Sequence, residues 1–376
     1  MRADLAARVE AFAKFSDSFT RPSIPDLSAL SAFLKTAPKV EFGPATRLSL
    51  LRKKRQTFAV ALVFLQPVLS ALASLCLLLR CGRFPRLAFL AYVAWFLVLD
   101  DAPRRGGRLS AAARRSVVWR WVADYFPVSL VKTTDLDPRR NYLFGYHPHG
   151  IISVGAITNF ATDATGFSEL FPGVELRVAT LAFNFKIPFF RELLLRCGVV
   201  DASSRSIAHC CSARNGPGAS CMVVIGGARE SLNARPGTQR LVLAERKGFV
   251  KVALRAGASL VPVFAFGEND LFDQAAARGV ARRVQVATQR LFGFTVPLFS
   301  GPNKGASGGF SVPGVLPHRH AIVSVVGSPV LVPAPIPEPT QEQVDEYHAK
   351  CARARRTRVL LPREGLSGMK LRRALS

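Results

Sequence analysis

An apolar stretch from Phe58 to Leu79, FAVALVFLQPVLSALASLCLLL, constrains this chain more than any other feature. Its 22 residues carry no charge, and a helix needs about 20 such residues to cross a bilayer. A second apolar stretch, Leu87–Leu99, follows after seven residues, and its 13 residues are short for a full crossing. Two such stretches in succession predict a membrane hairpin over residues 58–99, with a pair of buried core helices as the alternative.

Positive charge surrounds this apolar region and dominates the whole chain. The tetrapeptide RKKR ends at Arg55, just before the region, and three arginines follow between residues 104 and 108. Because membrane proteins keep such residues on the cytosolic side, we expect both ends of the hairpin in the cytosol, although three arginines in its turn weaken that orientation. The formal net charge of +26 requires an anionic partner, such as phospholipid headgroups, a phosphorylated substrate or nucleic acid.

Several classes of function are disfavoured by the absence of their signatures. The sequence has no zinc-finger spacing, no RNA-binding aromatic motif and no basic region followed by heptads, so we expect no nucleic-acid partner. Its seven cysteines form no C-x-x-C pair, which disfavours a disulfide framework or a metal site and fits a reduced, cytosol-facing domain. Phosphate-loop, dinucleotide and nucleophile-elbow motifs are absent too, so we expect no ATP or nicotinamide cofactor.

Beyond about residue 130, short apolar runs alternate with helical stretches. This alternation predicts an α/β fold with a mixed sheet covered by helices, preceded by the N-terminal hydrophobic membrane hairpin. The expected strands are Tyr142–Tyr146, Cys221–Gly227, Ser259–Gly267 and Ala321–Gly327, and the expected helices include Ser110–Phe126, Pro188–Gly198 and Arg246–Gly257. In the first of these helices, Trp119, Trp121 and Tyr125 suit a lipid headgroup layer.

The sequence predicts four parts along the chain. They are a cytosolic N-terminal segment 1–57, the membrane hairpin 58–99, a cytosol-facing domain 110–348 and a basic tail 349–376. Apolar residues between Leu5 and Phe19 in the first part are spaced for an amphipathic helix, which could lie on a membrane or pack on the protein. The tail is rich in arginine, as is typical of disordered or membrane-apposed segments.

Two of the six histidines flank a proline directly after a predicted strand, in the sequence His147-Pro148-His149-Gly150. Strand ends are where α/β proteins build their ligand sites. Proline restrains the backbone here, and Gly150 lets it approach a ligand closely. An imidazole held in this way can accept a proton near neutral pH, so both histidines are candidate general bases. A structural turn is one alternative, and a metal site is another, although no third ligand cluster is visible.

Two carboxylates and a basic helix start complete the set of candidates. GGARES and AFGEND both end predicted strands and place Glu230 and Glu268 beside glycines. Either carboxylate could orient an imidazole, hold a hydroxyl or serve as ordinary turn chemistry with a helix cap. RKGF sets Arg246, Lys247 and Gly248 at the start of a predicted helix, where free backbone N–H groups favour phosphate. A solvated charge pair is the alternative for this last motif.

Taken together, these stretches resemble the type-2 diacylglycerol acyltransferases, a family that includes monoacylglycerol and wax-alcohol acyltransferases. The resemblance covers about residues 58–348 and is carried by DYFP, NYLFGYHPHGI, NFATDATGFSELFPG, GGARESL, ERKGFVKVALRAGASLVPVFAFGEND and the pair Tyr347-His348. It implies an enzyme of the endoplasmic reticulum membrane and lipid droplets, anchored by a hairpin with both termini cytosolic. It also implies acyl transfer from acyl-CoA, as co-substrate, to the free hydroxyl of diacylglycerol or a related neutral lipid, giving triacylglycerol.

The resemblance further implies roles for individual residues. Plant members of the family carry E-P-H-G where this chain has H-P-H-G, so the shared histidine corresponds to His149. We therefore expect His149 to act as the general base, with His147 as a supporting residue or alternative base. Many glycerolipid acyltransferases place an aspartate five residues after the catalytic histidine, but here that position is Val154. The orienting acid must come from elsewhere, with Glu268 as the first choice and Glu230 as the second.

Two binding regions and an oxyanion site follow from the same resemblance. Backbone N–H groups near Gly150 could stabilise the tetrahedral oxyanion. The basic helix start is the candidate for the phosphates of acyl-CoA, through Arg246, Lys247 and Gly248. The sequence FLVL matches the pattern proposed in the family for contact with neutral lipid, through Phe96, Leu97 and Leu99, although a plain apolar stretch would match it as easily.

Two regions depart from the family pattern. SGPNKGASGGFSVPGVLPHRHAI replaces a tryptophan-glycine stretch and a basic-aromatic loop, and arginine-rich sequence follows His348 in place of an amphipathic helix. Because the C-terminal end is altered, a weakly active lipid-binding or scaffold protein of the droplet surface is an alternative function. The motifs also do not separate diacylglycerol from monoacylglycerol or another neutral alcohol as the acceptor. Acyl-chain preference and the formation of a homo-oligomer stay open as well.

Overall fold

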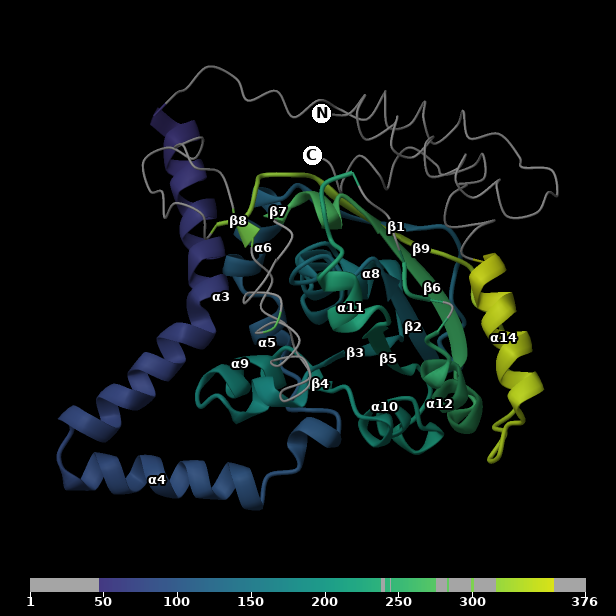
Figure 1. Ribbon diagram of the computed structural model, residues 1–376, viewed down its shortest axis with the longest axis horizontal. Helices are drawn as coiled ribbons and strands as arrows, with labels where there is room; N and C mark the ends of the chain where they lie inside the picture. The colour runs from purple at the N-terminus through teal and green to yellow at the C-terminus, as the bar shows by residue number, and fades with distance from the viewer. Residues whose placement is uncertain are drawn as a thin grey trace.

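The computed structural model describes residues 47–237, 241–243, 245–274, 283, 299–300 and 316–354. The amphipathic helix predicted before residue 20 lies outside the described residues, as do most of the basic tail and the divergent stretch 301–315. The described residues hold the apolar helices and the α/β region that follows them (Figure 1).

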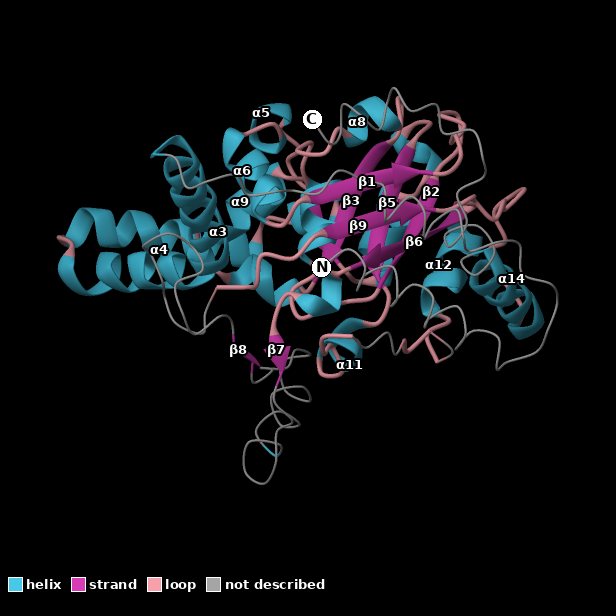
Figure 2. Cartoon of the chain, turned by 90° about the horizontal axis from the view of Figure 1, so that it is seen from above, coloured by secondary structure: helices cyan, strands magenta, loops and turns pink. Residues whose placement is uncertain are grey.

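A seven-stranded sheet forms the centre of the molecule, in the order β1-β9-β6-β2-β5-β3-β4. Neighbouring strands are parallel except β6 and β9, which are antiparallel. The predicted α/β class with a mixed, helix-covered sheet is therefore confirmed (Figure 2). The strands are β1 (Val128–Lys132), β2 (Tyr142–His147), β3 (Glu175–Thr180), β4 (Val199–Asp201), β5 (Ala219–Val224), β6 (Ser259–Phe266) and β9 (Ile322–Val326), and a separate small sheet pairs β7 (Asp273–Gln274) with β8 (Phe299–Ser300).

Helices cover both faces of the sheet and give two hydrophobic clusters. The first face packs on α6 (Val117–Tyr125), α7 (Val154–Ala156), the π-helical turn η2 (Ile157–Ala161) and α8 (Phe167–Leu170). The second face packs on α10 (Ser204–Cys210), α12 (Gly248–Ala256) and α14 (Gln341–Ala354). The remaining short elements are η1 (Ala102–Arg104), α5 (Ala111–Arg114), η3 (Ala182–Lys186), α9 (Phe190–Arg196), η4 (Ala213–Asn215), α11 (Gly227–Ser231) and η5 (Glu268–Asp270).

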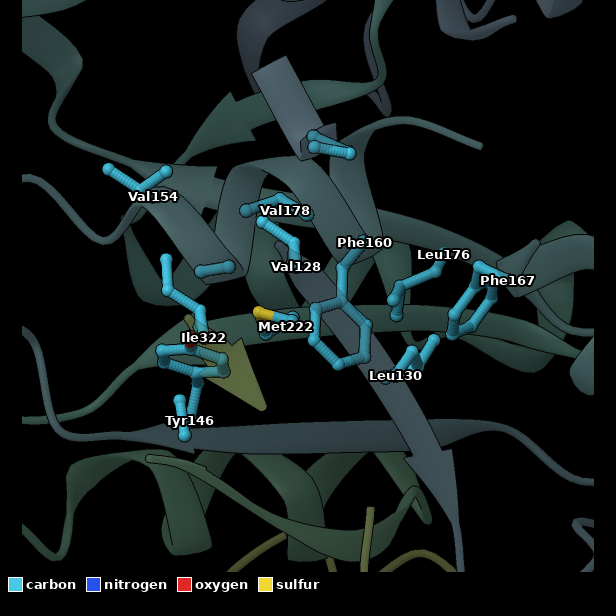
Figure 3. Close-up of a cluster of buried hydrophobic side chains, with 14 of the residues drawn as sticks. Val128, Leu130, Tyr146, Val154, Phe160, Phe167, Leu176, Val178, Met222 and Ile322 are labelled. Atoms are coloured by element: carbon cyan, nitrogen blue, oxygen red, sulfur yellow. The ribbon is translucent and has the colours of Figure 1, made fainter. Parts of the chain in front are cut away.

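Strand β2 shows how the two clusters divide the side chains. Successive residues of a strand point to opposite faces of the sheet. Tyr142, Phe144 and Tyr146 belong to the first cluster, whereas Leu143 belongs to the second. Figure 3 shows the first cluster, in which the Tyr146 ring lies among residues of several elements. The same alternation directs His147, the last residue of β2, to the face opposite Tyr146.

Helix α3 runs from Arg47 to Arg80 and begins earlier than the predicted apolar segment. Arginine and lysine are good helix formers, so the helix extends through the basic sequence that precedes the apolar residues. This first part is fixed to the domain, because Ala59 and Val60 are buried and Arg319 donates to the Gln56 side chain over 2.6 Å. Beyond Phe64, which packs on Phe126 and Phe272, α3 extends away from the sheet domain (Figure 1), and its apolar side chains there are largely exposed.

Helix α4, Arg83–Val98, follows α3 after two residues. The apolar faces of both helices are mostly exposed, so the alternative of two buried core helices is wrong. By length and composition, one described helix could cross a membrane, over Leu50–Arg80. The 16 residues of α4 span about 24 Å at 1.5 Å per residue, which is less than the roughly 30 Å hydrocarbon core.

The predicted helix Ser110–Phe126 is wrong in two respects. The structure divides it into α5 and α6, because the Arg114 carbonyl accepts from the Asp163 N–H instead of a helical partner and Ser116 has an extended ψ of 137. The aromatic face predicted for a lipid headgroup layer is instead packed against the protein, where Trp119 and Tyr125 are buried. Aromatic rings supply large apolar area and find hydrogen-bond partners for their polar atoms inside a core, which explains this outcome.

Candidate active site

The H-P-H-G turn begins where β2 ends, at His147. Both neighbours of β2 in the sheet, β5 and β6, run parallel to it. Their carboxyl ends therefore meet at the same edge, and the chain that follows them carries Glu230 in α11 and Glu268 in η5. The strand order thus brings together two histidines and two carboxylates that are more than 100 residues apart at their extremes. Such an edge is the usual place for ligands in α/β sheets.

Glu230 forms three hydrogen bonds, two of them to the histidine turn. One oxygen, Oε1, lies 3.2 Å from His147 Nδ1 and accepts from the Val242 N–H at 2.8 Å. The other, Oε2, accepts from the backbone N–H of His149 at 3.0 Å. Burial alone would raise the pKa of the Glu230 carboxyl, but the hydrogen bond and charge of His147 and the two backbone donors outweigh burial and lower that pKa. Glu230 is therefore an ionised carboxylate at neutral pH, and His147 Nδ1 is the donor.

His149 is the more accessible of the two imidazoles. Its side chain is partly buried, whereas His147 is fully enclosed and its Nε2 has no hydrogen-bond partner among the described residues. His149 Nδ1 lies 3.1 Å from the Gly150 carbonyl oxygen, which can only accept, so Nδ1 carries the proton. Nε2 then holds the lone pair. Burial lowers the pKa of the His149 imidazole, so the ring is neutral at pH 7 and able to accept a proton.

The backbone around His149 is held from a second point. The Ser153 hydroxyl donates to the His149 carbonyl oxygen at 2.7 Å, which closes the turn that follows. Gly150 has φ +59, and a Cβ at this position would lie 2.8 Å from the Glu268 side chain. Only glycine combines this left-handed conformation with so close an approach. Gly150 therefore sits directly between the catalytic candidate and the second carboxylate.

Glu268 lies on the opposite face of the sheet from Glu230. Its Oε2 accepts from the Tyr146 hydroxyl at 2.7 Å and from the Gly155 N–H at 3.0 Å. Burial raises the pKa of the Glu268 carboxyl to about 7, and the hydrogen bonds from Tyr146 and the backbone only limit that rise. Burial and the nearby carboxyl of Glu268 also raise the pKa of the Tyr146 phenol well above its usual value. The site therefore has one ionised carboxylate and one that holds a proton near neutral pH.

The expected order of the two acids is reversed in the structure. Glu268, the first choice for the acid that orients the imidazole, hydrogen-bonds Tyr146 and Gly155. Glu230, the second choice, contacts the His147 ring and the backbone of His149. The cause is the alternation of side chains along β2, which sends Tyr146 to the face of Glu268 and His147 to the face of Glu230.

Two contributors to the site were not predicted. Tyr146 partners Glu268, and Ser153 holds the His149 carbonyl. For Tyr146 a signal was present, because a residue next to a strand-end histidine must face the other layer, where a phenol needs a hydrogen-bond partner. Ser153 has a positive φ of 58, and no pattern in the sequence marks a serine for that conformation.

The basic motif expected to bind CoA phosphates lies on the same edge as the turn. The helix starts at Gly248 instead of Arg246, with Lys247 as its N-cap. Phe249, in its first turn, contacts the position where Gly145 of β2 would carry a Cβ. Arg246 and Gly248 are exposed, while the Lys247 ammonium pairs with the Asp345 carboxylate at 2.7 Å.

The expected lipid-contact residues in α4 and beyond it divide into two kinds. Leu97 and Leu99 are strongly exposed. Phe96 is buried, because its ring covers the guanidinium of Arg191, whose centre lies 4.7 Å from the ring centroid. Phe96 thus joins α4 to α9, and only the two leucines present free apolar surface.

As for metals, no group of three or more His, Cys, Asp or Glu side chains is arranged to hold an ion within the described part of the chain.

Comparisons with known proteins indicate the same family that the sequence motifs resemble. The profile of the diacylglycerol acyltransferase family matches residues 78–357. Diacylglycerol O-acyltransferase 2B of Umbelopsis ramanniana is 42% identical over 333 residues, which cover 85% of this chain and 90% of that protein. The 2-acylglycerol O-acyltransferase 1 of Bos taurus is 44% identical over 263 residues, which cover 69% of this chain and 76% of that protein.

Among solved structures, the 1-acyl-sn-glycerophosphate acyltransferase PlsC of Thermotoga maritima aligns over 80% of this chain and 91% of its own, with 12% identity and a TM-score of 0.37. That similarity is too low to carry an inference. The profile match and the sequence relatives are sufficient by themselves, since each extends over more than two thirds of the chain. The chain belongs to the diacylglycerol acyltransferase family.

Proposed function

We propose that this protein transfers a fatty acyl group from acyl-CoA to the free hydroxyl of diacylglycerol and so makes triacylglycerol. The observation that carries the proposal is the state of His149, a neutral imidazole whose Nδ1–H faces the Gly150 carbonyl and whose Nε2 keeps its lone pair. An alcohol becomes an effective nucleophile toward a thioester when such a base removes its proton during attack. Membership of the family supports both substrates.

The reaction needs no covalent acyl-enzyme. His149 Nε2 takes the proton of the diacylglycerol hydroxyl as the oxygen bonds to the thioester carbonyl carbon, and the carbonyl electrons move to its oxygen. Backbone N–H groups near Gly150 stabilise this oxyanion. When the tetrahedral intermediate collapses, the C–S bond breaks and the sulfur of CoA takes the proton from Nε2. Triacylglycerol and free CoA leave, and His149 returns to its neutral form.

His147 and the two glutamates act through the turn. His147 is enclosed, so a bulky alcohol cannot reach its ring, and its Nδ1–H donates to Glu230. Glu230 also binds the backbone N–H of His149, which makes it a positioning residue for the base. Glu268 packs beneath Gly150 and binds Gly155, so it positions the backbone that follows the base. This division of roles needs no metal and no cofactor beyond acyl-CoA as co-substrate.

Acyl-CoA brings phosphates that require a basic partner. Arg246 is exposed, and it follows Val242, which donates to Glu230, by four residues. Together with the exposed Gly248 at the start of α12, it suits a phosphate close to the reacting centre. Lys247 contributes once its ion pair with Asp345 opens. The formal net charge of +26 of the whole chain also favours the approach of the anionic acyl-CoA.

The proposed setting is the endoplasmic reticulum membrane and the surface of lipid droplets. α3 is long and apolar enough to anchor the chain, and α4 returns to the domain, where Tyr92 donates to the Glu192 side chain, which supports a hairpin with both termini cytosolic. Leu97 and Leu99 then contact neutral lipid from the exposed side of the hairpin. Glycosylation-site mapping of each terminus in microsomes tests this orientation. Cross-linking in the same membranes tests for a homo-oligomer.

The function is tested by incubating microsomes that contain this protein with labelled oleoyl-CoA and diacylglycerol. We expect labelled triacylglycerol from the parent and at least a 100-fold lower rate from an equally expressed His149→Ala variant, the lower end of what a general base contributes. Ser168→Ala serves as the matched control, because this exposed hydroxyl contacts only Asp163. No product from the parent, with its membrane association intact, would contradict the proposal.

A second acceptor is favoured by one comparison, the 44% identity to 2-acylglycerol O-acyltransferase 1 of Bos taurus. The same site would then acylate monoacylglycerol by the same chemistry. Presenting monoacylglycerol and diacylglycerol together, each with a different label, separates the two activities. A preference for diacylglycerol supports the first proposal, and a preference for monoacylglycerol replaces it with the second.

A further inference from the structure

The segment Leu181–Phe189, LAFNFKIPF, exposes three large apolar side chains on the catalytic domain. Leu181, Phe183 and Phe189 are 42%, 40% and 40% exposed. The segment contains no acidic residue, and its one charge is the exposed Lys186. Contiguous exposed apolar side chains rimmed by polar groups mark a surface that binds a partner or a membrane.

The topology places this segment at the active-site edge of the sheet. It follows Thr180, the last residue of β3, and β3 runs parallel to β5. β5 in turn runs parallel to β2, which ends at His147. The segment therefore leaves the sheet on the same edge as the histidine turn. An apolar partner bound here would lie beside the entrance to the reacting groups.

The segment is continuous with the exposed hairpin. The Phe189 ring stacks on Phe89 and Tyr92 of α4 at centroid distances of 5.9 Å, and its backbone N–H donates to the Tyr92 hydroxyl. Phe189 also has φ +62, a conformation that a bulky side chain rarely adopts and that commonly occurs at functional sites. Beside these contacts α4 exposes Leu87 and Leu90. Exposed apolar side chains of α4 and of the segment thus lie on two elements that are joined by the Phe189 ring.

The charges around this surface suit phospholipid headgroups. Both elements carry exposed cations, with Lys186 in the segment, Arg196 at the end of α9, and Arg83 and Arg86 in the first turn of α4. The acidic residue nearest in sequence to Lys186 and Arg196 is Glu192, which forms ion pairs with Arg108 and Arg191. Long cationic side chains at the rim of an apolar patch reach the headgroup layer while the apolar groups enter the acyl region.

We propose that Leu181–Phe189 forms a membrane contact of the catalytic domain, in which Leu181, Phe183 and Phe189 enter the phospholipid layer beside α4. The inference rests on the proposed membrane attachment through α3 and extends it to the domain itself. It sets the active-site edge against the lipid surface. A neutral-lipid acceptor could then reach His149 from the membrane without passing through water.

The test measures bilayer contact directly, without any assay of acyl transfer. Of the seven cysteines only Cys76 and Cys81 are not buried, so replacing both by serine leaves a background for labelling. Phe183→Cys is labelled with a fluorophore, and the purified full chain is reconstituted into phosphatidylcholine vesicles with brominated acyl chains. Leu72→Cys, on the exposed face of α3, is the positive control. Leu331→Cys is the matched control, because this 52% exposed leucine lies next to Val330, at the opposite end of β6 from the site.

Bromine quenches a fluorophore only at short range, so the expected pattern is quenching at positions 183 and 72 and none at 331. Quenching at position 72 alone overturns the inference. Quenching at all three positions also overturns it, because the contact would then not be specific to this surface. Absence of quenching at every position contradicts the membrane attachment on which the inference rests.

A second experiment separates this inference from the proposed activity. Phe183→Ser should weaken the apparent affinity for vesicle-borne diacylglycerol about tenfold, as expected for removal of one buried aromatic ring. Its rate with a short-chain, water-soluble acceptor should match the parent, as should both rates of Leu331→Ser. If Phe183→Ser and the parent have the same apparent affinity for vesicle-borne diacylglycerol, the inference is contradicted. If the parent is inactive with both acceptors, the proposed function is contradicted. The quenching experiment then still tests the membrane contact.

Discussion

The two faces of the sheet edge at β2 each hold one buried carboxylate, and the two carboxylates behave in opposite ways. Glu230 is ionised, since its partners lower its pKa, whereas burial raises the pKa of Glu268 to about 7. Each accepts hydrogen bonds from two backbone N–H groups. The difference lies in the third partner, which is the His147 imidazole for Glu230 and the Tyr146 phenol for Glu268.

Both faces donate hydrogen bonds to their carboxylate, but burial outweighs those bonds at Glu268, whereas the partners outweigh burial at Glu230. The face of Glu230 holds a fixed charge beneath the histidine turn. The face of Glu268 holds a proton and an enclosed oxygen, Oε1, with no hydrogen-bond partner among the described residues. Alternation along a single strand is therefore enough to create two different electrostatic environments a few ångströms from one base.

The largest effect is expected from Glu230→Gln. The carboxylate accepts from three N–H donors, whereas the amide of the variant has only one oxygen. Its NH2 group therefore faces at least one of these donors. Leaving buried donors without their carboxylate acceptor costs about 3 kcal/mol of unfolding free energy, and we expect acyl transfer to fall about 100-fold or more with the loss of the positioned base. Chemical unfolding and the rate of triacylglycerol formation measure the two effects. Parent-like activity would show that Glu230 does not position His149.

The pH dependence of stability should separate the two faces. Because the folded-state pKa of Glu268 is about 7 against an ordinary value of 4.5, the folded protein binds more protons than the unfolded chain between these values. Stability contributed by protonated Glu268 is therefore lost as pH rises from 4.5 to 7, by about 3 kcal/mol. The lowered pKa of Glu230 acts in the other direction, with stability present above pH 4.5 and lost as the pH falls further.

Glu268→Gln checks this sign. The neutral amide resembles the protonated carboxyl, so we expect the variant to match the parent near pH 5 and to be more stable than the parent at pH 8. Urea unfolding at both pH values gives the comparison. A variant whose stability changes with pH as steeply as that of the parent would place the titrating group elsewhere.

A smaller effect is expected from Tyr146→Phe. The ring keeps its packing in the first cluster, but Glu268 loses the hydrogen bond from the hydroxyl. The unfolding free energy should decrease by about 1–2 kcal/mol. Since that hydrogen bond lowers the Glu268 pKa, the midpoint of the pH-dependent loss of stability should also move upward. A midpoint that stays in place would mean that Tyr146 and Glu268 do not share the bond in solution.

The smallest effect is expected from Glu245→Gln, which removes an exposed ion pair with Arg229. Exposed pairs of this kind contribute little, because water and salt screen them. Melting temperature and acyl transfer should both equal those of the parent. A measurable loss of activity would indicate that Glu245, which directly precedes the basic Arg246 and Lys247, contributes to the site beyond this ion pair.

Much of the fold was accessible from the sequence because its signals are local. The uncharged run at Phe58 predicted the first helix of a membrane hairpin, and the structure has one long helix there; apolar runs predicted four strands that the structure has within a few residues of their expected bounds. Errors occurred where tertiary contacts decide. Trp119 and Tyr125 are residue types typical of a lipid-facing surface but are buried, because Trp119 donates to the Ala113 carbonyl and Tyr125 packs under Arg319 and donates to the Pro317 carbonyl.

The candidate site was predicted as a set of residues but not as an arrangement. His147, His149, Glu230 and Glu268 each follow a strand, and this was visible from the sequence. The partner of each carboxylate depends on the order β5-β2-β6 and on the faces of β2, which no local pattern specifies. The Gly150 carbonyl that fixes the His149 tautomer depends on the backbone of the turn and could not be predicted either.

The central claim is that His149 is the base and that the enclosed His147 positions it. The most direct test compares His149→Ala and His147→Ala for rescue by added imidazole, in purified protein with diacylglycerol and acyl-CoA. His149 is partly exposed, so its removal should abolish most activity and leave a space that imidazole can enter to restore part of it, whereas the enclosed site of His147 should show no rescue. Rescue of His147→Ala alone, with His149→Ala still active, would contradict the claim and make His147 the base.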